Sequence, residues 1–301
     1  MKRQTLIITL GLLLGSCASL TKTQIGAVNQ FSQASKNFSA YPSRVMTALA
    51  EIRVKRGVYF ANTLDSPKLH INELDKIYQA RKNSYKYSAK VDTTFKIIDK
   101  YAQSLMLLSS EKYVSDLKTQ ANNFGVDLDS LIKGYNSIEG VKQVPAGIGG
   151  AINKLIVLGG KQYVRSKQAK EIKKFVPAAD SLISVMTTNL LEFLQSKNIQ
   201  FLVKNEEEEV NSNYLSFLRQ RQPGIENERD YLDLKSNIDA IKQLRDQTVA
   251  ATKHLRRAHK KLLLAIQRRK TLKETIPELQ DLYEDVKEIN TTIEVIKSSK
   301  N

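Results

Sequence analysis

Several residue types are scarce in this chain of 301 residues, and each scarcity narrows the range of folds. There is one cysteine, Cys17, and no tryptophan, and the 13 glycines and 6 prolines are few for this length. A single thiol cannot form a disulfide within the chain, so packing alone must hold the fold. Few turn residues, with recurrent Lys, Leu, Ile, Ala, Gln and Ser, favour long helices over a sheet sandwich.

Acidic residues are also outnumbered. The chain has 47 Lys and Arg against 31 Asp and Glu, which gives a formal net charge of +16. Such a balance suits contact with anionic lipid, lipopolysaccharide phosphates, acidic glycans or nucleic acid. It would equally suit a soluble surface without a partner, so charge alone does not choose between these roles.

The N-terminal segment has the order of a secretory signal. Lys2 and Arg3 precede an apolar run from Leu6 to Leu14, which is too short for a comfortable membrane span of roughly 20 residues. The four residues Leu14-Gly15-Ser16-Cys17 then resemble the lipobox of bacterial lipoproteins. The alternatives are an ordinary secretory signal with a chance cysteine, or a short N-terminal anchor.

The resemblance implies a cellular location. It implies cleavage before Cys17, acylation of its sulfur and amine, and a membrane anchor, with residues 1–16 as signal peptide and 17–24 as tether. Ala18 lacks the aspartate associated with inner-membrane retention, which favours the periplasmic face of the outer membrane in a Gram-negative host. Export argues against nucleic acid as a partner.

Residues 25–140 have helical periodicity. Pro42 interrupts the first apolar series and predicts a kink or two helices meeting there. Ser66-Pro67 is typical of a helix start, and the helix it opens should end at about Ser109. One face of that helix carries the apolar residues Ile71, Leu74, Tyr78, Tyr85, Phe95, Ile98, Ala102 and Leu105. These two segments predict a long antiparallel hairpin, followed by a less regular helix that breaks near Gly125.

Residues 161–301 form the predicted C-terminal region. A long helical segment is expected from Ser181 to Val203. From Ile241 to Ile293 apolar residues recur by threes and fours, which predicts a coiled-coil-like heptad register. Pro277 should kink or restart this rod near Ile276. The predicted fold is all-α, an elongated bundle of long antiparallel helices, with the heptads paired within the chain in preference to a second copy.

Motifs for catalysis are scarce. His254 and His259 are five residues apart, so they do not share a helix face as a metal pair would, and all three histidines are expected to be surface residues. The chain contains neither a Gly-x-Ser-x-Gly elbow nor a phosphate-binding loop. We therefore expect no enzyme activity, no metal and no cofactor.

A basic strip is a stronger candidate site. Its cations are Lys253, Arg256, Arg257, Lys260, Lys261, Arg268 and Lys270. They would dock on anionic lipid, lipopolysaccharide or an acidic partner. The alternative is a solvated helix face, neutralised by the acidic run Glu206 to Glu209 packed alongside.

Residues 141–160 hold a glycine-rich window, part of an apolar segment from Val144 to Tyr163. Its small and apolar residues include Gly147, Gly149, Gly150, Leu155, Gly159 and Gly160. Such a segment would enter or lie on a membrane. A buried hinge between two helical regions explains the same residues.

These observations predict a lipid-anchored, non-catalytic helical protein of a bacterial envelope that acts as a binding or scaffolding module. Its partner would be an unknown envelope protein, and a homo-oligomer is compatible with the heptads. The alternative is a membrane-active protein of the pore-forming or membrane-remodelling type. A third reading, an envelope enzyme, has the least support.

Overall fold

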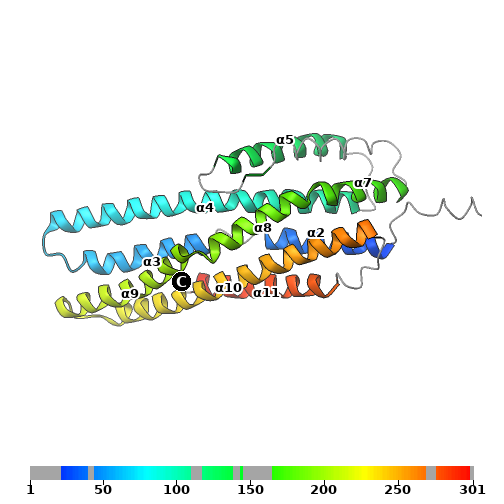
Figure 1. The fold of residues 1–301 in the computed structure, drawn as a ribbon. Coiled ribbons are helices and arrows are strands. Elements are labelled where there is room, and N and C mark those ends of the chain that lie inside the picture. Colours follow the sequence, from blue (N-terminus) through cyan, green and yellow to red (C-terminus); the bar gives the residue numbers. More distant parts are fainter. Residues whose placement is uncertain are drawn as a thin grey trace, which may run out of the picture. The chain divides into compact units, whose positions relative to one another are not determined.

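The computed structural model describes residues 22–39, 44–109, 117–137, 143–144, 165–268 and 276–298. Within these ranges every regular element is an α-helix, which confirms the all-α class (Figure 1). The helices are α2 (Lys22–Phe38), α3 (Arg44–Ala61), α4 (Pro67–Ser109), α5 (Leu117–Asn136), α7 (Arg165–Ala178), α8 (Asp180–Leu194), α9 (Lys197–Gln220), α10 (Ile225–Arg268) and α11 (Ile276–Ser298). The coiled-coil register and a bundle-wide antiparallel arrangement stay predictions.

The N-terminal helix boundaries follow the sequence signals. Two helices, α2 and α3, lie on either side of Pro42, and α4 runs from Pro67 to Ser109 as predicted. The expected break at Gly125 is wrong, because α5 continues through that residue. One glycine costs a helix only about 1 kcal/mol, which the rest of the helix offsets.

The predicted helix from Ser181 to Val203 is in fact divided between α8 and α9. Ser196 begins the second helix, and its side chain accepts a hydrogen bond from the backbone N–H of Ile199 at 3.3 Å. This is an N-cap, which satisfies one of the donors that the first turn leaves without a helical partner. The apolar periodicity continues across Ser196, so the sequence pattern does not indicate a helix boundary there.

The heptad segment likewise folds as two helices, because α10 ends at Arg268 and α11 restarts at Ile276. Gln247 accepts a hydrogen bond from Thr292 at 2.9 Å, whereas His254 lies 2.5 Å from Asp285. From the first pair to the second, the residue number rises in α10 and falls in α11. These two helices therefore run in opposite directions. The restart predicted near Ile276 is therefore confirmed, and the chain reverses its direction there.

The residues of the predicted seam are buried in α10 and partly buried in α11. In α10 the predicted seam is buried, at Ile241, Leu244, Thr248, Ala251, Leu255, Ala258, Leu262 and Ala265. In α11 the predicted seam residues Leu279, Val286 and Ile293 are also buried. Tyr283 is exposed, and its neighbour Leu282 is buried.

The chain divides into two compact units. Unit 1 draws its described residues from the ranges Met1–Lys36, Ile97–Val185 and Leu255–Gln280. Unit 2 draws them from Asn37–Lys96, Met186–His254 and Asp281–Asn301. Each unit therefore has a core assembled from segments that are far apart in the sequence.

The core of unit 1 is built on stacked aromatic rings. Tyr101 stacks on Phe175 with ring centroids 5.5 Å apart, and Phe31 meets the same tyrosine edge-on at 6.3 Å. Leu105 and Leu128 are fully buried in this unit. Burial of this apolar surface is the main term that stabilises the unit, since no disulfide assists it.

In unit 2, α3 packs closely on α4 because Gly57 has no side chain. A Cβ built on Gly57 would lie 2.8 Å from two carbons of the Ile77 side chain, and Glu51 of α3 accepts a hydrogen bond from Arg81 of α4 at 3.1 Å. These pairs show that α3 and α4 run in opposite directions. The turn at residues 62–66 joins them.

This close approach predicts that Gly57→Ala will lower thermal stability. The added methyl group overpacks against Ile77, at a cost of about 1–3 kcal/mol, which outweighs the gain of up to about 1 kcal/mol in helix propensity. The matched control is Gly26→Ala in α2, where nothing lies within 4 Å of the new Cβ and stability should rise. Thermal unfolding that showed the same increase for both variants would contradict this packing.

Candidate interaction surface

One end of unit 2 is formed by two helix-turn-helix hairpins lying side by side. The turn at residues 62–66 joins α3 to α4, and the turn at residues 221–224 joins α9 to α10; both lie at the left of Figure 1. Arg221 of the second turn approaches Asp65 of the first at 3.9 Å. The two turns therefore share one surface.

Aromatic residues hold the two hairpins together behind these turns. Tyr59 of α3 donates a hydrogen bond to the backbone carbonyl of Asn227 at 3.0 Å, and its ring lies 5.3 Å from Tyr214 and 5.5 Å from Phe217. Burial, aided by the charge of Asp230, raises the pKa of Tyr59 well above its ordinary value. The hydroxyl therefore stays protonated and acts as a donor.

A second tyrosine pair closes α9 on α10. Tyr214 and Tyr231 stack with centroids 4.2 Å apart, and the Tyr231 hydroxyl donates to Asn211 at 2.9 Å. Lys235 places its ammonium 5.8 Å from the Tyr231 ring, within the range of a cation–π contact. These contacts fix the start of α10 against the end of α9.

The acidic run Glu206 to Glu209 makes charged hydrogen bonds within unit 2. The fully buried Glu206 accepts two hydrogen bonds from Arg53, at 2.8 and 2.6 Å, and a further one from Arg56. Glu209 lies 3.5 Å from Arg56. Arg53 pairs with Glu206 and Arg56 with Glu209, so the residue numbers of the two helices increase together. The two helices α3 and α9 therefore run in the same direction.

The other acidic residues of the run also pair locally. Glu207 accepts a hydrogen bond from Lys242 at 2.9 Å, and Glu208 lies 3.4 Å from Lys204. The run therefore binds cations of α3, α9 and α10, while its neutralisation of the basic strip at residues 253–270 stays a prediction. Sequence spacing alone gives no sign of these long-range pairs.

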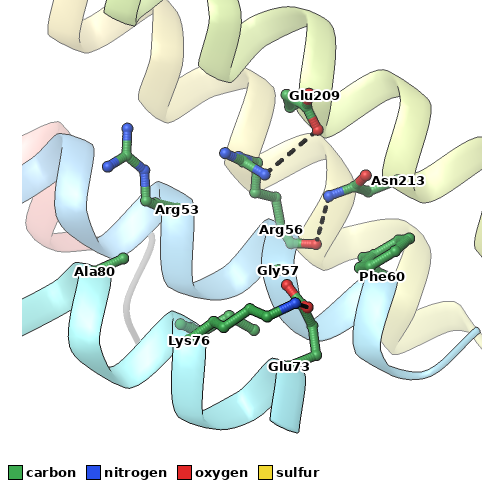
Figure 2. Close-up of a pocket in the computed structure, with 10 residues that line it drawn as sticks. Arg53, Arg56, Gly57, Phe60, Glu73, Lys76, Ala80, Glu209 and Asn213 are labelled. Carbon is green, nitrogen blue, oxygen red and sulfur yellow. Dashed lines mark hydrogen bonds and ion pairs between the residues drawn. The ribbon is translucent and has the colours of Figure 1, made fainter. Parts of the chain in front are cut away.

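A cavity of about 290 Å³ opens beside this cluster, between α3, α4 and α9 (Figure 2). Three cations line it, but each is paired: Arg53 and Arg56 with Glu206, and Lys76 with Glu73 at 3.0 Å. An anionic ligand would have to displace these carboxylates. The cavity is therefore a poor anion site, and the cluster holds the helices together.

The outer face of α4 carries exposed apolar side chains that no helix covers among the described ranges. Ile71 is 59% exposed, Leu74 39% and Tyr78 61%. The sequence places these residues on roughly one face of α4 with Phe95, Ile98, Ala102 and Leu105, and these four later residues are buried. In the first turns α4 instead turns Ile77 toward α3, and the exposed residues lie roughly 60–120° away around the helix.

Other exposed apolar side chains lie on the same four helices near these turns. They are Val58 and Phe60 of α3, Leu69 of α4, Leu215 and Leu218 of α9, and Ile225 and Leu232 of α10. Single exposed apolar residues are ordinary, but a group at one end of a unit is typical of an interaction site. This end of unit 2 is therefore the candidate interaction surface.

The basic strip is only partly available. Lys253, Arg256 and Lys260 are exposed on α10, whereas Arg257 and Lys261 each lie 2.9 Å from Glu278 of α11. The side chain of Arg268 and all of Lys270 lie outside the described residues.

Glu278 is a strongly held carboxylate. Its burial opposes ionisation, but the hydrogen bonds from Lys261 and Arg257 outweigh burial and lower the pKa of Glu278. These two cations therefore support the contact between α10 and α11 in unit 1. A partner surface would meet only the remaining cations of the strip.

Two of the three histidines are not the surface residues that the sequence predicts. His254 is half-buried against Asp285, and burial raises the pKa of that carboxyl. His259 is fully buried, with its Nδ1 3.0 Å from the Tyr101 hydroxyl. Both positions lie on inward-facing stripes of α10, where the apolar neighbours give no sign that a histidine finds a polar partner.

The environment of His259 is structural. Its Nε2 lies 3.3 Å from Asp180, and this close imidazole lowers the pKa of the carboxyl. Burial, with the charge of Asp180, raises the pKa of Tyr101. The four groups Phe31, Tyr101, Phe175 and His259 pack as one aromatic cluster.

The remaining predicted positions fall mostly outside the described residues. These are Cys17, Gly147, Gly149, Gly150, Leu155, Gly159 and Gly160. Val144, at the start of the predicted apolar segment, is buried and exchanges two 2.8 Å hydrogen bonds with the Asn136 side chain. None of the described helices is both long enough and apolar enough to cross a membrane.

Comparisons of the chain with protein-family models, with curated proteins and with solved structures found no match.

The buried ion pairs predict a large effect of Glu206→Gln. This change leaves Arg53 and Arg56 with no charged partner at the buried position, and the free energy of unfolding should fall by about 3 kcal/mol. The control is Glu208→Gln, which breaks an exposed pair and should cost less than about 1 kcal/mol. Denaturant unfolding of both variants measures the difference, and equal midpoints would refute a structural role for Glu206.

Proposed function

We propose that the chain is a lipid-anchored, non-catalytic helical protein of a bacterial envelope that serves as a binding or scaffolding module. The lipobox-like residues Leu14-Gly15-Ser16-Cys17 support the anchor. The observation that carries the binding role is the group of exposed apolar side chains at one end of unit 2.

The binding role follows from the cost of leaving such side chains in water. Full burial of one large apolar side chain is worth about 1.5–3 kcal/mol, so a partner that covers Ile71, Leu74 and Tyr78 gains several such contributions. Rigid support matters as well, because a surface that is already ordered loses less entropy on binding. The Glu206 ion pairs and the Tyr59 contacts provide that support.

The proposed location is the periplasmic face of the outer membrane in a Gram-negative host, with acyl chains on Cys17. An envelope protein is the proposed partner. The exposed Lys253, Arg256 and Lys260 add a secondary attraction to anionic lipid or lipopolysaccharide of about 1 kcal/mol for each cation near the surface. The membrane-active alternative depends on residues 144–163 and stays a prediction.

Cys17→Ser tests the anchor. The full chain, expressed in a Gram-negative host fed labelled palmitate, should incorporate the label and sediment with membranes. Cys17→Ser should incorporate no label and should lose the mature, membrane-bound form, since the acylated sulfur is gone. Ser16→Ala is the control, because it keeps a small residue before the cysteine and should behave as wild type.

Two outcomes would count against the proposal. Labelled, mature protein in the Cys17→Ser variant would remove the lipobox argument. Release of a trapped dye from anionic vesicles by the purified full chain would place the membrane-active alternative first.

A further inference from the structure

The exposed face of α4 has the spacing of a helix-pairing seam. Ile71, Leu74 and Tyr78 follow one another by three and four residues, as the a and d positions of a coiled coil do. Lys68 and Asp75 are seven residues apart and so occupy the same position beside the seam. Both are exposed, and no ion pair is found for either of them among the residues that the structure describes.

We infer that this face docks against the same face of a second copy of the chain, with the two α4 helices antiparallel. The inference rests on the proposed binding role and names its partner. A two-fold axis between residues 72 and 73 sets Ile71 against the partner's Leu74. The same axis brings Tyr78 to the partner's Pro67, so each apolar side chain of the seam gains an apolar neighbour.

Charge complementarity selects this register and this occupant. In antiparallel pairs, residues at this flanking position face each other, so Lys68 lies opposite the partner's Asp75, and the reverse pair forms at the other side of the axis. Moving the register by one heptad toward the C-terminus would set Asp75 against its own copy. An anionic bilayer would attract Lys68 but repel Asp75, whereas a second copy satisfies both.

The position of the seam also permits this pairing. Because α4 begins at Pro67, two antiparallel copies overlap only along its first three turns, and the rest of the two helices extend away from each other. Isologous contacts of this kind close at two copies and do not continue into a filament.

The contact is small. Three apolar side chains on each copy cover much less than the roughly 800 Å² per partner of stable complexes, so the pair is weak in dilute solution. Anchoring copies to one membrane raises their effective concentration and favours the pair. The test therefore uses the protein in membranes.

The experiment combines cross-linking with charge reversal. The full chain carries the photoreactive p-benzoylphenylalanine in place of Tyr78 and is irradiated in membranes. The expected product has twice the chain mass, with position 78 of one copy cross-linked near residue 67 of the other. In a dimer of the Lys68→Glu variant, each new glutamate at position 68 faces the acidic Asp75 of the other copy. In a dimer of the Asp75→Lys variant, each new lysine at position 75 faces the basic Lys68 of the other copy. Because like charges repel, each variant alone should lower the cross-linking yield roughly tenfold. Co-expression of the two variants should restore it, because every flanking pair is again opposite in charge.

Lys82→Glu is the control. It lies one heptad after Asp75 at the same flanking position but outside the overlap, so the yield should not change. A loss in this variant would overturn the register. Absence of a dimer product, cross-linking to lipid or to another protein, or yields that ignore charge reversal would overturn the proposal itself.

These results are independent of the anchor. If Cys17→Ser showed that the chain is not lipidated, the same irradiation could be repeated on purified full chain at high concentration. Restoration by the mixed charge variants would still support pairing, and its absence would still overturn it.

Discussion

The burial of Glu206 between Arg53 and Arg56 is the constraint on which the arrangement of unit 2 depends. A buried carboxylate is costly unless cations compensate it, so α9 must lie where α3 supplies two guanidinium groups. Those contacts set α3 and α9 in the same direction. The turns that follow these two helices then come to the same end of the unit, where Arg221 approaches Asp65.

The shape of the candidate surface follows from this arrangement. Gly57 lets α4 approach α3 closely through Ile77, which leaves Ile71 and Tyr78 on the outside. Tyr59 then ties the first hairpin to the start of α10. The exposed side chains thus stand on helices whose positions are set by contacts a few residues away, so this surface has a defined shape.

The sequence predicted the elements better than their pairing. Local signals sufficed for α4, since Ser66-Pro67 marks its start, and for the restart at Ile276 before Pro277. The division at Ser196 was missed because a cap within a continuous apolar pattern is not distinctive. The pairing of Glu206 with Arg53 spans 153 residues, and nothing local reports such a contact. The exposed face of α4 was missed for a related reason: periodicity identifies an apolar stripe but not whether another helix covers it.

The most direct test of the account asks whether the α4 face is covered when the chain is held on the membrane that we propose for it. Hydroxyl-radical footprinting would compare the oxidation rate of Tyr78 in the anchored, full-length protein with that in dilute detergent solution. Tyr283, similarly exposed on α11, serves as the internal reference. The account predicts that the membrane form protects Tyr78 several-fold relative to Tyr283. Equal oxidation of both tyrosines in the two states would show that nothing binds this face, and would contradict the account.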